Sequence, residues 1–185
     1  MRHVAFLRNI NQGQRGHPSR ADILAAFAGA GARDAVTFQA NGTVVFAADD
    51  PQAVVDDAVD ALVVPAGVAY AGFRMPLPTL AAIVDAHAAE LDVGRRELTL
   101  HRGGTFAADD PEVMRVAAHR RCEVVDAGDG WIVSVNERDH ESNATPVAER
   151  LTGGPATSRG LPTLVRLIDR FAQGPSTGDQ SDSSR

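Results

Sequence analysis

Apolar residues recur along the first half of the chain with two different spacings, and these spacings predict an ordered series of strands and helices. Short apolar runs rich in β-branched and aromatic residues predict strands at 3–10, 35–39, 43–47 and 67–75. Between them, apolar residues three or four positions apart predict helices that begin after Ser19, at Pro51 and at Pro78. Asn41-Gly42 is a strong hairpin sequence between the second and third strands. The order is β-α-β-β-α-β-α.

The second half of the chain repeats this order. Its pattern predicts strands at 97–102, 123–127, 131–135 and 155–159. Gly128-Asp129-Gly130 predicts a hairpin between the second and third of these strands. Helices are predicted to begin at Pro111, at Thr145 and at Leu161.

Two repeated sequences bear on whether the halves are related. FAADDP occurs at 46–51 and at 106–111, but the copies join different pairs of elements, so they indicate only two similar helix starts. In contrast, LPTLAAIVD begins at Leu77 and LPTLVRLID at Leu161, and each opens the last helix of its half. An arginine, Arg74 or Arg159, stands shortly before each copy. This second pair predicts an internal duplication, against the alternative that common helix-start residues match by chance.

The predicted fold is α+β, with two ferredoxin-like β-α-β-β-α-β-α units related by duplication. The predicted domains are 1–94 and 95–172. Residues 173–185 are polar and are predicted to be a disordered tail.

Composition narrows the classes of function. The net charge is −6 and the sequence contains no lysine, which argues against nucleic acid as a partner because neutralising phosphates requires basic surface. Cys122 is the only cysteine, so no intrachain disulfide can form. No apolar run approaches the roughly 20 residues that span a bilayer, and the first residues do not form a signal peptide. We therefore expect a cytoplasmic protein that binds no membrane.

Three stretches resemble a bacterial family of uncharacterised proteins, DUF1697. They are LRNINQGQRGHPSRADILAAFAGAG, TFQANGTVVF and ATSRGLPTLVRL. The resemblance covers nearly the whole chain without its tail, and it implies a duplicated α/β protein but no activity or ligand. The chain departs from the family pattern at Asn9, where a glycine is typical, at Gly13-Gln14, at the hairpin 41–43 and along 158–163. If the typical polar residues there bind a ligand, this member has changed or lost that ability.

The loop after the first strand is the first candidate site. Arg8, Asn11, Arg15 and Arg20 cluster with His17 between a strand end and a helix N-terminus, where free N–H groups favour an anion. Gly13 would permit a close approach of the backbone. The alternative, favoured by the lack of any known nucleotide-binding motif, is a solvated loop whose arginines pair with neighbouring aspartates.

The start of the last helix is the second candidate site. Thr157, Ser158, Arg159 and Thr163 offer hydroxyl groups and a guanidinium that could hold a carboxylate or phosphate. The alternative assigns Arg159 to backbone carbonyls or aspartates across the domain interface, and Thr163 to the first turn of the helix.

Other chemistries find less support. RNA binding is disfavoured, because Asn41 and Thr43 occupy the positions at which an RNA-recognition domain has aromatic rings that stack on bases. His119 and Cys122 form half of a metal site without a second pair, so we expect no metal and no cofactor, with Cys122 as a core residue. His87 is expected to be a core histidine with its hydrogen bonds satisfied. The sequence leaves open a catalytic set whose members meet only in space.

The leading functional hypothesis is a non-enzymatic binding protein with an anion-accepting cleft formed by the Arg8–Arg20 loop and Arg159. The first alternative is an enzyme acting on a small anionic metabolite, with His17 or His101 as the titratable group. The second alternative is a homodimer formed through an open sheet edge, which light scattering would detect.

Overall fold

The computed structural model describes residues 1–62, 70–139 and 141–171. The strands are β1 (Arg2–Arg8), β2 (Arg33–Phe38), β3 (Thr43–Ala47), β4 (Ala71–Pro76), β5 (Arg96–His101), β6 (Cys122–Gly128), β7 (Trp131–Asn136) and β8 (Ala156–Gly160). The helices are α1 (Arg20–Gly29), α2 (Pro51–Ala61), α3 (Leu77–His87), α4 (Pro111–His119), α5 (Ala144–Thr152) and α6 (Leu161–Phe171), with a 3-10 turn η1 (Val93–Arg95). The predicted tail at 173–185 lies outside the described residues.

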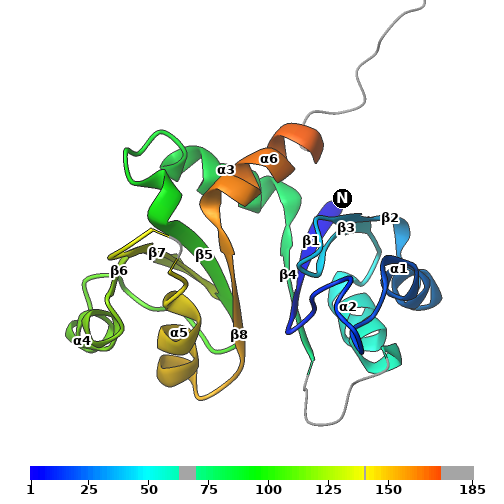
Figure 1. Cartoon of the computed structure of the whole chain (residues 1–185), viewed down its shortest axis with the longest axis horizontal. Coiled ribbons are helices and arrows are strands. Elements are labelled where there is room, and N and C mark those ends of the chain that lie inside the picture. Colours follow the sequence, from blue (N-terminus) through cyan, green and yellow to red (C-terminus); the bar gives the residue numbers. More distant parts are fainter. Residues whose placement is uncertain (63–69, 140, 172–185) are drawn as a thin grey trace, which may run out of the picture.

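Within the described residues the protein is α+β, with two four-stranded antiparallel sheets and six helices. The strand order is β2-β3-β1-β4 in the first sheet and β6-β7-β5-β8 in the second. Numbered from the first strand of each sheet, the two orders are the same. We call β1 to α3 the N-terminal half and β5 to α6 the C-terminal half. In Figure 1 the two sheets stand side by side, with the N-terminal half on the right.

The predicted helix starts are largely confirmed, and the caps explain why. Ser19 and Asp22 form a capping box at the start of α1. Asp50 and Asp110, the capping aspartates of the two FAADDP copies, accept hydrogen bonds from the first turns of α2 and α4. The repeated sequence element thus has the local role that the sequence predicts.

Two helices begin earlier than predicted. Helix α3 begins at Leu77, so that Pro78 occupies its first turn, where a missing N–H costs nothing. Helix α5 begins at Ala144 instead of Thr145. The reason is a distant cap: the buried carboxylate of Glu97 in β5 accepts hydrogen bonds from the main-chain N–H groups of Asn143 (2.9 Å) and Ala144 (3.1 Å). A cap supplied by another strand has no local sequence pattern.

Both predicted hairpins are present, and they resemble each other in detail. The β2–β3 hairpin turns through Gly42 and the β6–β7 hairpin through Gly130, each with positive φ. Leu7 N–H donates to Gly42 O (2.8 Å), and His101 N–H donates to Gly130 O (2.9 Å). Each central strand therefore ends against the hairpin of its own sheet in the same way.

The central strands are buried on both faces, which creates three apolar layers. In β1, Ala5 and Leu7 pack beneath α1 and α2, whereas Val4 and Phe6 face the other half. Leu98 and Leu100 of β5 face the N-terminal half in the same manner. Helices α1 and α2 cover the outside of one sheet, and α4 and α5 cover the outside of the other (Figure 1).

The middle layer belongs to both halves. Helices α3 and α6 contribute Leu80, Ile83, Leu164 and Leu167 to a single core cluster with side chains from both sheets. These apolar side chains are buried in a layer to which both halves contribute. At about 25 cal/mol per Å² of buried apolar surface, this shared layer is a main source of stability.

Because the middle layer is shared, we predict that Leu167→Ala destabilises the whole protein by about 2–5 kcal/mol, since Leu167 is 0% exposed. Urea unfolding followed by circular dichroism would measure this change. Met114→Ala is the matched control, because Met114 is 57% exposed and should change the free energy of unfolding by less than about 0.5 kcal/mol. Equal effects of the two substitutions would contradict the assignment of the shared core.

Candidate functional site

Arg159, a predicted ligand-binding residue, is buried between the halves, with 8% of its surface exposed. Its guanidinium donates to Leu7 O (3.1 Å), to Asn41 O (2.5 Å) and to Thr43 Oγ1 (3.1 Å) of the N-terminal half. Within its own half it donates to Thr157 Oγ1 (3.0 Å) and Ser158 O (2.8 Å). We call the cavity that the guanidinium fills the Arg159 pocket. Arg159 thus binds backbone carbonyls across the contact between the halves, as the alternative interpretation of the sequence expected. All five N–H donors of its guanidinium are engaged, so none is left for a ligand.

The environment of Arg159 explains how a cation is tolerated there. Its Cζ lies 5.1 Å from the centroid of the Phe6 ring, a favourable cation–π arrangement. Burial lowers the pKa of Arg159 to about 10, so the guanidinium still carries its charge at neutral pH. The dipoles of the surrounding carbonyl and hydroxyl groups stabilise that charge, since no carboxylate forms an ion pair with Arg159 in the described part of the chain.

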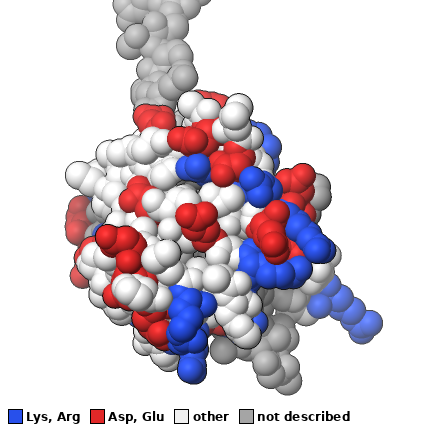
Figure 2. All heavy atoms as spheres, turned by 90° about the vertical axis from the view of Figure 1, so that its left-hand side faces the viewer, with Lys and Arg blue, Asp and Glu red and all other residues white. Residues whose placement is uncertain are grey.

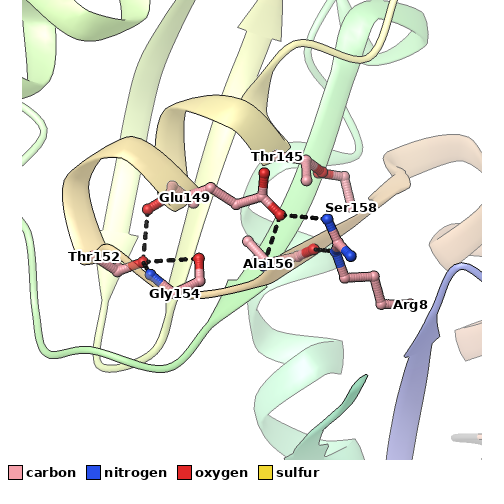
Figure 3. A network of polar contacts seen from close by, with 8 residues as sticks. Arg8, Thr145, Glu149, Thr152, Gly154, Ala156 and Ser158 are labelled. Carbon is pink, nitrogen blue, oxygen red and sulfur yellow. Dashed lines mark hydrogen bonds and ion pairs between the residues drawn. The ribbon is translucent and has the colours of Figure 1, made fainter. Parts of the chain in front are cut away.

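Arg8 also crosses to the other half (Figure 3). Its Nε donates to Ala156 O (3.1 Å), and its Nη2 forms an ion pair with Glu149 (2.7 Å). Glu149 also accepts from Ala156 N–H (3.4 Å). One carbonyl and one carboxylate of the other half thus bind the guanidinium, so Arg8 is a bridge between β1 and the β8–α5 region.

Arg102 forms the reverse bridge, which the sequence analysis missed. Its Nη2 donates to Gly72 O (2.8 Å) and to Asp56 (2.5 Å), and its Cζ lies 5.8 Å from the centroid of the Phe73 ring. Arg102 follows β5 as Arg8 ends β1, and Asp56 and Glu149 are each the sixth residue of their helix. A comparison of the two predicted central strands could have found this pair.

The other predicted residues of the first loop do not converge with Arg8 and Arg159. Asn11, Gly13, Arg15 and Arg20 are exposed, and neither Arg15 nor Arg20 makes an ion pair with a described residue. A cavity of about 570 Å³ beside the loop is lined by His17 and Asp22, with no arginine among its lining residues.

The capping box explains why the α1 N-terminus is a poor anion site. The Asp22 carboxylate already accepts from Ser19 N–H (2.8 Å) and Ser19 Oγ (2.7 Å), and these hydrogen bonds lower the pKa of Asp22. The capping box thus satisfies the N–H groups of Ser19 and Asp22 and places a carboxylate beside the helix start, where it repels a second anion. Thr163, predicted at the α6 start, accepts a hydrogen bond from Arg166 (3.2 Å) within its own helix.

A different cavity, of about 380 Å³, opens between the halves along β4. We call it the β4 groove. Its lining includes Phe73, Arg74, Met75, Leu100, Arg102, Asp129 and Trp131.

The free edge of β4 forms one wall of this groove. β4 is the outermost strand of its sheet. Leu7 of β1 donates its main-chain N–H to Gly42 of the hairpin and not to its paired residue in β4, Gly72. In an antiparallel pair, the main-chain groups of Gly72, and of Arg74 two residues later, therefore point away from β1. Gly72 O accepts from Arg102, whereas the main-chain N–H and C=O of Arg74 make no hydrogen bond with a described residue.

The charges that line the β4 groove are only partly neutralised. Arg102 is paired with Asp56, but the side chains of Arg74 and Asp129 make no hydrogen bond or ion pair with another described residue. The groove therefore offers one cation and one anion, together with the aromatic surface of Trp131. None of these residues except Arg74 attracts notice in the sequence, because their proximity arises only when the halves pack.

His101, a candidate for the titratable group of an enzyme, is among the residues that line the β4 groove, but its ring lies on the other face of the sheet. His101 is 4% exposed, and its ring packs on Phe106 at 5.0 Å, on the α4–α5 face of the sheet. Burial lowers the pKa of His101, and the charge of Asp129 opposes this only in part. Neither ring nitrogen has a hydrogen-bond partner among the described residues. His17 Nδ1 accepts only from Asn11 N–H (3.5 Å) among those residues.

Two further predictions concern His87 and Cys122. His87 is buried, and its ring nitrogens contact Asp126 (3.0 Å) and Arg96 (2.6 Å), as expected for a satisfied core histidine. Cys122 is buried, and its Sγ lies 3.7 Å from Ala117 O. The described residues contain no group of three or more metal-binding side chains.

The lengths of the helices and the distribution of surface charge can be compared with what a membrane or a nucleic acid requires. No helix in the described ranges is long and apolar enough to cross a membrane. On the face shown in Figure 2, acidic and arginine side chains are interspersed. That face offers no broad basic area to a polyanion.

Comparison with known proteins gives a family and a fold. The family described as "Protein of unknown function (DUF1697)" matches residues 1–123. No curated protein matches the chain. A solved structure, the conserved bacterial protein SP0830 from Streptococcus pneumoniae, is similar with a TM-score of 0.53 and 14% identity, over 91% of this chain and 97% of that protein. At this identity the likeness shows the fold alone.

The burial of Arg159 generates a prediction about stability. Arg159→Met should lower the free energy of unfolding by about 2–4 kcal/mol, because it leaves carbonyl groups of both halves without donors. Arg20→Met is the control, and its exposed side chain predicts a change below about 0.5 kcal/mol. Chemical denaturation of both variants makes the comparison. An Arg159→Met protein as stable as the parent would refute the structural role.

The environment of Cys122 generates a prediction about reactivity. Burial, assisted by the charge of Glu97, raises the pKa of the Cys122 thiol to about 11. At pH 8 the reactive thiolate should therefore be at least about a hundredfold scarcer than in free cysteine. Labelling with a chromogenic disulfide should be slow in the native protein and fast in urea. Rapid native labelling at pH 8 would show that the thiol is accessible.

Proposed function

The chain belongs to the DUF1697 family of proteins of unknown function, and we propose that it is a non-enzymatic binding protein whose ligand occupies the β4 groove. The ligand is a small molecule that carries an anionic group, a carboxylate or a phosphate. In this proposal the binding site moves from the first loop and Arg159, as the sequence predicted, to the free edge of β4. Arg8 and Arg159 then hold the two halves together.

We further propose that the halves are ferredoxin-like units that arose by duplication. Three observations support this origin. The strand orders are equivalent, the two LPTL sequences open the closing helices of the two halves, and the Arg8 and Arg102 bridges have matching partners. A duplicated unit explains why a site at the contact between the halves occurs in two versions.

One observation carries the binding proposal: Arg74 is among the residues that line the groove, and neither its side chain nor its main chain has a hydrogen-bond or ion-pair partner in the described residues. Arg74 pairs with Ala5, so its side chain leaves β4 on the α1–α2 face and meets a ligand at the free edge of the strand. A guanidinium that is half-buried and not neutralised attracts a carboxylate or phosphate, and can bind it through two parallel hydrogen bonds. The positive charge of Arg74 also contributes to lowering the pKa of the nearby buried His3, after the larger effect of burial.

The size of the groove suits a small molecule. A volume of about 380 Å³ lies in the range of roughly 300–1,000 Å³ typical of small-molecule sites. The enzyme alternative has less support, since the His101 ring packs on Phe106 on the other face of the sheet and neither ring nitrogen has a hydrogen-bond partner by geometry among the described residues.

This proposal predicts that succinate, a small dicarboxylate, raises the melting temperature and gives a binding isotherm in calorimetry. Arg74→Gln should weaken the affinity for succinate at least about tenfold, because the charge-assisted hydrogen bonds are lost. Arg20→Gln, which removes an exposed arginine of the first loop, should leave the affinity unchanged. If Arg20→Gln abolishes binding and Arg74→Gln does not, the site is in the first loop.

A further inference from the structure

The two halves place different residues at one equivalent position, which changes the chemistry of the cavity between them. Met75 and Arg159 each stand two residues before the leucine that opens α3 or α6. Met75 pairs with Val4 of β1, and Arg159 pairs with Leu98 of β5. The Arg159 pocket and the β4 groove are therefore two versions of the same site, and only one of them contains a guanidinium at this position.

The acceptors around the two versions also correspond. In the Arg159 pocket, the guanidinium binds Leu7 O and Asn41 O. Leu7 and His101 occupy equivalent places, since each donates its N–H to the glycine carbonyl of its hairpin. Asp129 precedes Gly130 as Asn41 precedes Gly42. His101 O and Asp129 O thus form the counterpart of the carbonyl pair that holds Arg159.

The β4 groove has two features that favour a cation more than the Arg159 pocket does. Asp129 replaces Asn41, which adds a carboxylate with no partner in the described residues. Trp131, which pairs with Leu100, replaces Thr43, which pairs with Phe6. Tryptophan offers the strongest cation–π surface of the natural side chains.

The nearby arginine bridge does not prevent a cation from binding. Arg159 is held in a pocket whose neighbour Arg8 is neutralised by Glu149. In the β4 groove, Arg102 is neutralised by Asp56 in the same way. Arg159 therefore shows that a guanidinium can lie beside an arginine that is neutralised by a carboxylate.

We propose that the β4 groove binds the guanidinium group of its ligand, in the manner in which the Arg159 pocket holds its own. This inference rests on the proposed function and specifies the ligand further. Arg74 takes the carboxylate, while Asp129, His101 O and Trp131 take the guanidinium. The ligand is then a small molecule of the arginine type, bearing both a carboxylate and a guanidinium.

Calorimetric titration of the full chain with L-arginine tests this inference, with L-citrulline as the matched control. Citrulline has nearly the same shape, but an uncharged ureido group replaces the guanidinium. We expect L-arginine to bind at least about tenfold more tightly than L-citrulline. Asp129→Asn should remove this preference and leave succinate binding intact. The variant should fold, because asparagine already stands at the equivalent hairpin position, Asn41.

Each outcome separates the guanidinium inference from the proposed function. Equal affinities for arginine and citrulline, or an arginine affinity unaltered in Asp129→Asn, would overturn the guanidinium inference. Succinate binding that depends on Arg74, without arginine binding, would leave the anion site standing and reject this extension. If neither succinate nor arginine binds, both proposals are wrong. Arginine binding that needs Asp129, without succinate binding, would support the guanidinium site and refute the anion site.

Discussion

Each of the two sheets leaves main-chain carbonyls unpaired where it faces the other half, and arginine side chains crossing between the halves satisfy them. Arg8 donates to Ala156 O, Arg102 to Gly72 O, and Arg159 to Leu7 O and Asn41 O. A guanidinium can do this because it carries five N–H donors in one plane and stays charged when buried. Without these donors, the packing of the apolar middle layer would bury unpaired carbonyls at a cost of about 1–3 kcal/mol each.

The same arrangement accounts for the location of the proposed site. Two equivalent arginine bridges join the halves, and two equivalent strand positions, Met75 and Arg159, lie beside the contact. Arg159 fills the cavity at its position, whereas Met75 leaves the β4 groove open. One copy of a duplicated site has in this account become structural, which leaves the second copy to bind a ligand. Because strands and hairpins form its walls, the β4 groove is held in shape by the core.

Sequence patterns predicted much of the fold, since local features determine it. A short apolar run defines β1 and alternating leucines define β5, the capping residues Ser19, Asp50 and Asp110 define helix starts, and the hairpin glycines define both turns. The start of α5 was misplaced because its cap, Glu97, comes from another strand. The candidate site was harder to predict for the same reason. Arg8 and Arg159 were recognised as notable residues, but their carbonyl partners lie more than a hundred residues away in the chain.

The equivalence of Met75 and Arg159 is the central claim, and a crystal structure of the Met75→Arg variant tests it most directly. The account predicts a folded protein in which the new guanidinium fills the β4 groove, contacts His101 O and Asp129, and lies against Trp131. A substituted side chain directed elsewhere, in a protein whose groove stays open, would contradict the claim that the two cavities are versions of one site.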